Sequence, residues 1–209
     1  KCKEQSRDMG TPFPLLTVLD DPLLIKRIAE CHNSATPQQE SSKPPVRVFA
    51  QQTQPTKIAY VSSDLDTSHP VGVNLKPLLE AHDRRRFKFL AINLSEMPEA
   101  NLLPHFDEMV HGYGLTDAEI GDWAKTQGID IAIDLNGYTE GSRIGIFAQR
   151  IAPIQINYLG YPGTMGTSFH DYIVGDPYVI PPGYEACFSE QVLRLPHFLM
   201  PYDFKPQEN

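Results

Sequence analysis

The sequence contains few cysteines and no long apolar run. Its three cysteines, Cys2, Cys31 and Cys187, are odd in number and far apart, a spacing typical of neither a disulfide framework nor a zinc site. This favours a reducing compartment, and we expect a cytoplasmic location. No stretch approaches the roughly 18 apolar residues of a membrane helix, and the start of the chain lacks the apolar core of a signal peptide. We therefore expect no membrane partner.

Basic charge is scarce as well. Lys and Arg number 18 against 26 Asp and Glu, which gives a formal net charge of -8. Nucleic-acid binding usually depends on a basic field, so we expect no nucleic-acid partner. The one basic run, the three arginines at 84–86, follows Asp83 directly and is typical of a solvated turn between a helix and a strand.

Several motifs of enzyme chemistry are missing. No G-x-x-x-x-G-K-[ST] and no clean G-x-G-x-x-G follows the first predicted strand, which argues against a P-loop enzyme and gives a dinucleotide enzyme little support. The G-x-S-x-G elbow of serine hydrolases is also absent. No two histidines have the H-x-x-x-H spacing of a metal site, so we expect no bound metal.

What the chain does contain falls into three parts. Apolar residues recur at near-helical spacing over 14–32, which predicts a helical segment. Pro22 breaks this segment, and Asp21 is placed to cap a second helix that begins at the proline. A stretch rich in Ser, Pro, Gln and Thr follows and is typical of a linker. The predicted parts are a helical segment at 1–35, a linker at 36–56 and a globular lobe at 57–209.

The predicted lobe alternates between strands and helices. Apolar runs predict strands from Lys57 and from Ile154, and further strands at 87–93, 106–110, 129–135, 171–176 and 191–196. Helical patterns lie between them at 71–82, 116–127 and 142–150. The second of these begins with a capping-box signature, Thr116 followed by Glu119. Such alternation predicts an α/β fold with a Rossmann-like parallel sheet and helices on both faces.

Polar and Gly-rich loops follow three of these strands, at 62–72, 136–143 and 159–166. Because the carboxyl ends of parallel strands meet at one edge of a sheet, we expect these loops to form a ligand site. Asp64 and His69 could act there as a general acid and base, or could be a turn residue and a surface ring. In the third loop, small residues would let a ligand such as a sugar approach the main chain.

Four segments of the lobe carry a family resemblance: YVSSD at 60–64, HPVG at 69–72, DLNGYTEGSR at 134–143 and APIQINYLGYPGTMG at 152–166. They resemble the amino-terminal half of the catalytic region of protein O-GlcNAc transferases, including bacterial and SPINDLY-like members. The resemblance implies one lobe of a two-lobed, B-type, inverting glycosyltransferase. It also implies UDP-GlcNAc as donor, Ser or Thr hydroxyls of proteins as acceptors, no cofactor or metal, and tetratricopeptide repeats upstream.

The resemblance also assigns roles to individual residues. His69 matches the family's active-site histidine in the first loop, and Asp64 matches its candidate proton acceptor. The backbone that cradles the sugar matches Leu159, Gly160 and Pro162. The residues that line the acceptor side of the cleft match Tyr138 and Thr139.

Three features set limits on this resemblance. The loop between Asp64 and His69 is one residue longer than usual in the family, and Glu140 stands where animal members carry a lysine. The chain also stops at Asn209, about where a second lobe is expected to begin. That missing lobe would be a required partner, so we expect this chain alone to be inactive. A non-catalytic binding scaffold, and a transferase that uses fucose or glucose, are the alternatives.

Overall fold

Seven parallel strands form one sheet in the computed structural model, which describes residues 11–34, 54–97 and 100–201. The strands lie in the order β3-β2-β1-β4-β5-β6-β7, and every neighbouring pair is parallel. Their bounds are β1 Thr56–Ser62, β2 Phe87–Asn93, β3 Glu108–His111, β4 Ile131–Asp134, β5 Ile154–Asn157, β6 Tyr172–Gly175 and β7 Gln191–Arg194. The predicted Rossmann-like parallel sheet is therefore confirmed.

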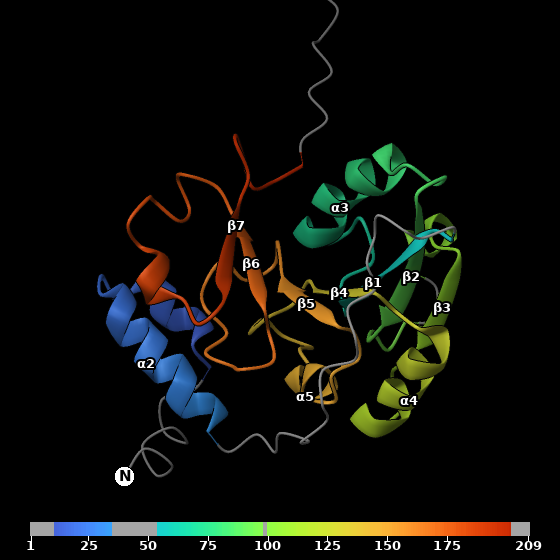
Figure 1. Cartoon of the computed structure of the whole chain (residues 1–209). Coiled ribbons are helices and arrows are strands. Elements are labelled where there is room, and N and C mark those ends of the chain that lie inside the picture. Colours follow the sequence, from blue (N-terminus) through green and yellow to red (C-terminus); the bar gives the residue numbers. More distant parts are fainter. Residues whose placement is uncertain (1–10, 35–53, 98–99, 202–209) are drawn as a thin grey trace, which may run out of the picture.

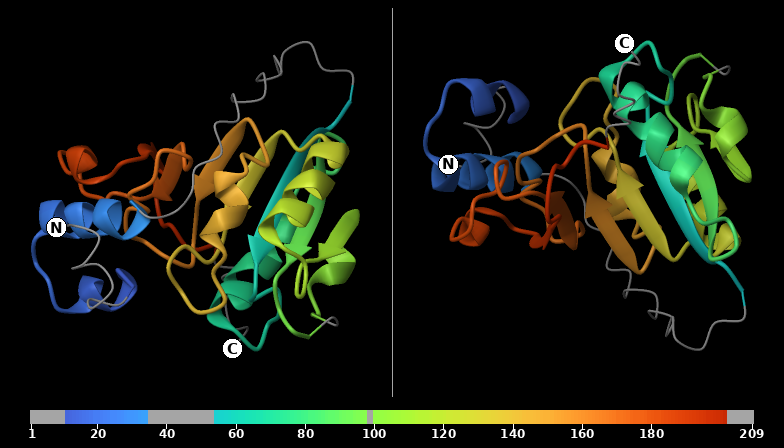
Figure 2. Two further views of the ribbon diagram at one scale, coloured as in Figure 1. Left: turned by 90° about the horizontal axis from the view of Figure 1, so that it is seen from below. Right: turned by 90° about the horizontal axis from the view of Figure 1, so that it is seen from above.

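Helices cover both faces of this sheet (Figure 1). Helix α3 (Pro70–Ala81) lies on one face, and α4 (Asp117–Gln127) and α5 (Ile144–Ala148) lie on the other, as the two views in Figure 2 show. The side chains buried on the α3 face include Leu65, Leu75, Leu79 and Phe89. Those buried on the α4 and α5 face include Val61, Leu90, Ile120 and Phe147. Burial of each such side chain contributes about 1.5–3 kcal/mol, so the two cores hold the sheet in place.

The amino-terminal segment forms two short helices that break at the predicted proline. A 3-10 helix, η1 (Phe13–Thr17), comes first, and α2 (Pro22–Asn33) follows with a proline as its first helical residue. Asp21 caps α2, because its side chain accepts a hydrogen bond from the backbone N–H of Leu24 at 3.0 Å. α2 lies at the β7 end of the sheet, in contact with η4 (Glu185–Cys187), as Figure 1 shows.

The division of the chain into three parts stays a prediction. Residues 1–10 and 35–53, which include most of the predicted linker, lie outside the described residues. β1 begins at Thr56, one residue before the predicted start of the lobe.

Helix α4 begins with the predicted capping box. The Thr116 hydroxyl accepts a hydrogen bond from the backbone N–H of Glu119 at 3.2 Å. The Glu119 carboxylate in turn accepts one from the backbone N–H of Thr116 at 2.7 Å. These bonds satisfy two donors that would otherwise lack a partner at the start of the helix.

Several helices and strands have bounds in the structure that differ from the predicted ones. The third strand is displaced toward the carboxyl terminus because η3 (Leu103–His105) occupies the chain before it. The strand predicted at 129–135 is shortened to β4, and the helix predicted at 142–150 is shortened to α5. Arg150 has φ 55°, which ends that helix, and Leu159 has φ 76°, which no strand residue adopts.

Two features bear on location. Cys31 is disulfide-bonded and Cys187 is a free cysteine. The expectation of a reducing compartment stays a prediction. Within the described ranges, no helix combines the length and the apolar character needed to cross a membrane.

A histidine at the end of α3 should make stability depend on pH. The His82 ring stacks on Phe89 with centroids 4.0 Å apart, and its Nε2 lies 2.8 Å from the Tyr60 hydroxyl. Burial, and secondly the charge of Arg84, lowers the pKa of His82 from 6.5 to about 4. The unfolded chain therefore binds this proton more tightly than the folded chain. The contribution of the neutral His82 ring to the free energy of unfolding is complete above pH 6.5 and is lost as the pH falls toward 4.

We expect His82→Gln to remove part of this acid sensitivity, because a glutamine does not titrate and can still bond the Tyr60 hydroxyl. The ring is only half-buried, so solvent screening limits the effect to about 1–2 kcal/mol. Urea unfolding at pH 7 and at pH 4.5 measures it. If the parent chain and the His82→Gln variant lose equal stability between pH 7 and pH 4.5, His82 does not contribute to the acid sensitivity.

Candidate functional site

The candidate site lies where the strand order reverses. β1 is followed in the chain by β2 on one side, and β4 pairs with β1 on its other side. The connections after β1 and after β4 therefore leave toward opposite faces of the sheet, through α3 and through α5. In open α/β sheets a ligand crevice forms at such a switch point, outside the carboxyl ends of the strands.

The side-chain amide of Asn136 joins the two loops at this point. Its Oδ1 accepts a hydrogen bond from the backbone N–H of Ser63 at 2.9 Å. Its Nδ2 donates to the Asp64 carboxylate, also at 2.9 Å, and to the Ser63 hydroxyl at 2.9 Å. Asn136 is only 1% exposed, so the amide is fixed by its surroundings. The loop after β4 thereby sets the position of the Asp64 carboxylate in the loop after β1.

Asp64 and His69 are brought together, as the resemblance implied. The Asp64 Oδ2 lies 3.8 Å from the His69 Nδ1, and their side chains are 19% and 46% exposed. His69 is also the N-cap of α3, because its Nδ1 accepts the backbone N–H of Val71 at 3.3 Å. His69 thus caps the helix while its ring stays partly exposed at the end of the loop. A carboxylate and an imidazole at the open edge of the sheet can exchange protons with a bound hydroxyl.

The third loop makes a tight and strained turn beside them. The backbone N–H of Gly160 bonds the carbonyl of Tyr158 at 3.1 Å, and Leu159 between them has φ 76°. This is a γ-turn with positive φ, which is rare for a residue other than glycine and costs about 1–3 kcal/mol. Leu159 is buried at 8% exposure, so its packing holds the turn. Backbone strain of this kind often marks a ligand site.

Gly160 brings this turn against the other two loops. A Cβ on Gly160 would lie 1.9 Å from the carbonyl oxygen of Leu135 and 3.5 Å from the Val71 side chain. Leu135 follows β4, and Val71 begins α3, so three loops distant in sequence meet around one glycine. Only a residue without a side chain permits this approach.

Of the remaining predicted residues, Tyr138 packs against His32 of α2 and Pro162 shares a cavity with residues of α2. Tyr138 is 4% exposed, and its hydroxyl donates to the Met165 carbonyl at 2.6 Å, so it supports the loops from inside rather than lining an open surface. Thr139 is half-buried and bonds the Asn136 carbonyl at 3.0 Å. Pro162 lines a largely apolar cavity of about 300 Å³, shared with η1, α2 and residues 179–188.

Tyrosines near the site are held in their protonated form. Burial raises the pKa of Tyr158 to about 12. Burial also raises the pKa of Tyr138 and of Tyr161 well above the usual range, and the charge of Glu190 adds to the effect in both. These phenols can donate hydrogen bonds at neutral pH but cannot serve as bases.

A buried pair beneath the site was missed in the sequence. Asp134, the last residue of β4, lies 3.1 Å from the His170 Nε2, and their side chains are 4% and 0% exposed. Asn136 and Asp134 both lie in the DLNGYTEGSR segment at 134–143. An aspartate at the end of an apolar strand, followed by Asn-Gly, is a signal for side-chain bonding within a turn and could have indicated Asp134. No comparable signal marks His170.

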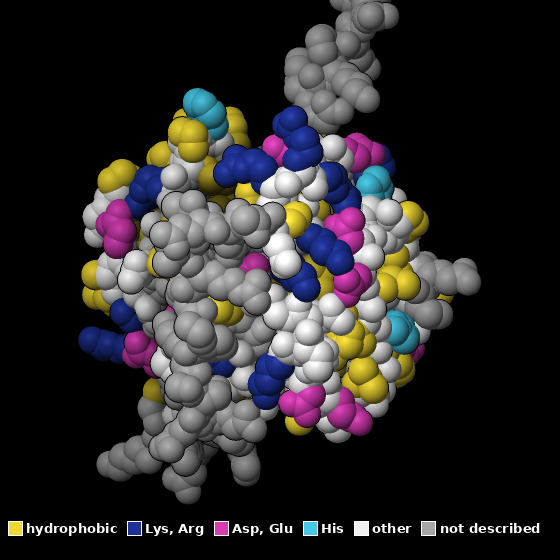
Figure 3. Space-filling model, turned by 45° about the vertical axis from the view of Figure 1, so that its right-hand side comes forward, with side chains coloured by type: hydrophobic (Ala, Val, Ile, Leu, Met, Phe, Trp, Pro, Cys, Tyr) yellow, Lys and Arg dark blue, Asp and Glu magenta, His cyan; other side chains and the backbone are white. Residues whose placement is uncertain are grey.

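No group of three or more His, Cys, Asp or Glu side chains that could hold a metal ion exists among residues 11–34, 54–97 and 100–201. The expectation that no metal is required stays a prediction. On the face shown in Figure 3, basic and acidic side chains lie among one another.

Comparison with known proteins places these features in a family. The family model described as glycosyl transferase family 41 matches residues 23–205. The chain belongs to glycosyl transferase family 41. This confirms the family that the four sequence segments indicated, and the match covers the candidate site and all of helix α2 except its first residue.

Similar proteins carry consistent names. The family 41 chain is 33% identical over 153 residues to the probable UDP-N-acetylglucosamine–peptide N-acetylglucosaminyltransferase SEC of Arabidopsis thaliana. It is 35% identical over 156 residues to the UDP-N-acetylglucosamine–peptide N-acetylglucosaminyltransferase of Caenorhabditis elegans. These matches cover 71% and 72% of this chain, but only 16% and 14% of those proteins. The chain thus spans a small part of the length of its relatives.

A solved structure supports the fold assignment. The structure of a mutant O-GlcNAc transferase from Thermobaculum terrenum superimposes with a TM-score of 0.81 at 31% sequence identity. The match covers 90% of this family 41 chain and 37% of that protein.

Proposed function

We propose that this chain forms the amino-terminal lobe of an inverting transferase that moves N-acetylglucosamine from UDP-GlcNAc to Ser or Thr hydroxyls of proteins. The observation that carries the proposal is the meeting of Asp64, His69 and Asn136 at the switch point of a family 41 chain. The names of the relatives and the superposition support the same activity. A cytoplasmic location and upstream tetratricopeptide repeats remain predictions.

The reaction requires a base for the acceptor hydroxyl. The hydroxyl oxygen attacks the anomeric carbon of the sugar, the bond from that carbon to the diphosphate breaks, UDP leaves, and the hydroxyl proton goes to a group on the enzyme. The Asp64 Oδ2 accepts from Asn136, which leaves the lone pairs of its other oxygen to take this proton. We therefore assign the proton to Asp64.

His69 has a different role in this proposal. Because its Nδ1 accepts the backbone N–H of Val71, the neutral ring carries its proton on Nε2. That nitrogen can donate a hydrogen bond to a substrate oxygen but cannot accept one. His69 therefore orients a substrate rather than taking its proton.

The strained turn at Leu159 and Gly160 presents backbone groups to the sugar. A sugar has many hydroxyls and little charge, so main-chain donors and acceptors beside a glycine suit it. The diphosphate that leaves requires cationic stabilisation, which we assign to a second lobe outside this chain. We expect the 209-residue chain alone to transfer no sugar.

A chimera tests the proposal. In it, this chain replaces the matching region of the Thermobaculum terrenum O-GlcNAc transferase. The expected result is transfer of radiolabelled GlcNAc from UDP-GlcNAc to a Ser- and Thr-containing peptide, whereas the Thermobaculum protein with that region deleted transfers none. A chimera that unfolds cooperatively yet transfers nothing, under conditions in which the parent enzyme is active, would overturn the proposal.

A further inference from the structure

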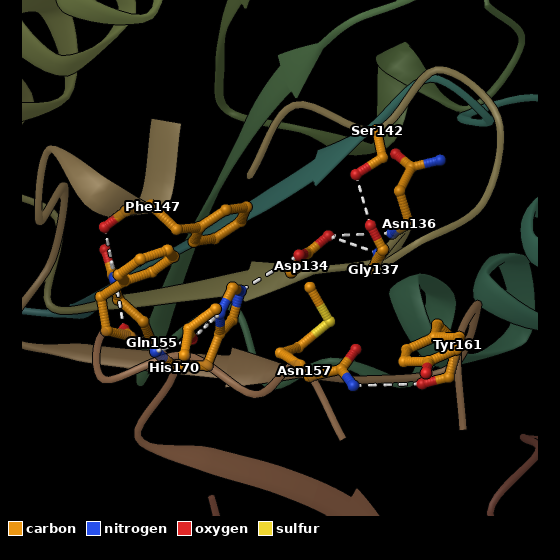
Figure 4. Close-up of polar contacts among 12 residues, drawn as sticks. Asp134, Asn136, Gly137, Ser142, Phe147, Gln155, Asn157, Tyr161 and His170 are labelled. Carbon is orange, nitrogen blue, oxygen red and sulfur yellow. Dashed lines mark hydrogen bonds and ion pairs between the residues drawn. The ribbon is translucent and has the colours of Figure 1, made fainter. Parts of the chain in front are cut away.

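The buried pair Asp134 and His170 lies directly beneath the turn that holds Asn136 (Figure 4). His170 comes just before β6, and its ring packs against Phe147 of α5 with centroids 4.9 Å apart. Neither Asp134 nor His170 is exposed to a substrate, since their side chains are 4% and 0% exposed. Their effect on a reaction would have to pass through other residues.

The two oxygens of the Asp134 carboxylate accept hydrogen bonds from two different parts of the chain. Its Oδ1 accepts the backbone N–H groups of Asn136 at 3.0 Å and of Gly137 at 2.9 Å. Its Oδ2 faces the His170 Nε2 at 3.1 Å. A carboxylate can only accept hydrogen bonds, so Nε2 carries a proton and donates it. Each oxygen of a nearly fully buried carboxylate therefore has a partner.

The other side of the His170 ring is also fixed. Its Nδ1 lies 2.9 Å from the Thr167 hydroxyl, which also accepts the backbone N–H of His170 at 3.1 Å. The hydroxyl can then donate its own hydrogen to Nδ1. This arrangement satisfies every group with a neutral ring protonated on Nε2.

The turn above the pair depends on this support. Gly137 has φ 58°, and a Cβ there would lie 2.4 Å from the Cβ of Tyr161, so the turn is tightly constrained. Asp134 fixes the backbone of this turn, and the side chain of Asn136 extends from it to Asp64 at 2.9 Å. A change in the orientation of the Asp134 carboxylate would therefore move the group that holds the proposed base.

We propose that His170 is a positioning residue. It holds the Asp134 carboxylate, which fixes the turn at Asn136 and Gly137 and thereby sets the amide that orients Asp64. The link to catalysis rests on the proposed function, whereas the hydrogen-bond chain from His170 to Asn136 does not. A small displacement of a base can cost about 10- to 100-fold in rate.

Nitrogen NMR of the 209-residue chain tests the network without any mutation. The expected spectrum shows His170 neutral, with the proton on Nε2 and a bare Nδ1. A ring protonated on Nδ1 alone would overturn the proposal.

Hydrogen exchange of variants in the same chain tests the coupling. His170→Leu should speed exchange of the Asn136 and Gly137 amides by about 10-fold, the equivalent of one lost hydrogen bond. His170→Gln keeps a donor toward Asp134 and should preserve most of the protection. Thr167→Val, which removes the hydroxyl but keeps the shape, should give an intermediate result. If these two amides do not change, or if those of β2 accelerate equally, the proposed coupling is wrong.

The chimera separates this proposal from the proposed function. There His170→Leu should lower kcat by about 10-fold with little change in the KM for UDP-GlcNAc, and His170→Gln should restore most of it. A kcat unaffected by His170→Leu would overturn the positioning role. An inactive chimera whose exchange results are as expected would instead count against the proposed function alone.

Discussion

Replacing Asp64 by asparagine is expected to lower kcat for sugar transfer by about 10²- to 10⁴-fold, the usual contribution of a general base. Asparagine has nearly the same shape, and its oxygen can still accept the hydrogen bond from Asn136, but it cannot take a proton. Steady-state kinetics of the chimera with UDP-GlcNAc and a peptide measure the effect.

Glu140→Gln is the matched control for Asp64→Asn. It removes the same charge from an exposed residue in the neighbouring loop, and only the backbone carbonyl of Glu140 bonds Ser63 and Asn136. We expect its kcat to stay within about 2-fold of the parent, because a surface charge contributes little. Equal losses in both variants would mean that charge, and not proton transfer, explains the effect of Asp64→Asn.

Gly160→Ala is expected to have the largest effect on stability in the site. Its methyl group would lie 1.9 Å from the Leu135 carbonyl oxygen, and a backbone atom cannot move aside as a flexible side chain can. Overpacking of this kind costs about 1–3 kcal/mol or more, and here it would also displace the turn that we propose faces the sugar. The urea concentration at which half of the chain unfolds, and the activity of the chimera, should both be reduced.

Gly114→Ala provides the comparison for this variant. Gly114 has φ 85°, and a methyl group there would meet nothing within 4 Å, so the substitution carries the cost of a positive φ without a steric clash. That cost is about 1–2 kcal/mol. If Gly160→Ala is no less stable than Gly114→Ala and keeps full activity, the close approach of the three loops is not required.

Local chemistry explains which parts of the fold could be predicted. Asp21 before a proline, and Thr116 three residues before Glu119, mark helix starts through bonds within a few residues, and both were found. The parallel sheet followed from alternating apolar patterns. The end of β5 is not evident from the sequence, because the positive φ of Leu159 depends on its packing in the folded chain.

The candidate site was only partly predictable for a similar reason. Asp64 and His69 lie in one loop, so their proximity was a reasonable expectation, and the family resemblance favoured it. Asn136 reaches Asp64 only because β1 and β4 are paired in register, with Val61 beside Asp134. His170 is 36 positions from Asp134, and only the arrangement of β4, β5 and β6 brings them together.

The sugar site is the central claim, and one measurement tests it most directly. It is the rate of GlcNAc transfer from UDP-GlcNAc by the chimera with Asp64→Ala and His69→Ala combined. Our account predicts a loss of at least about 10³-fold, with a folded protein, since both the proton acceptor and the orienting donor are removed. A double variant that transfers sugar at the unchanged rate would contradict the assignment of this site.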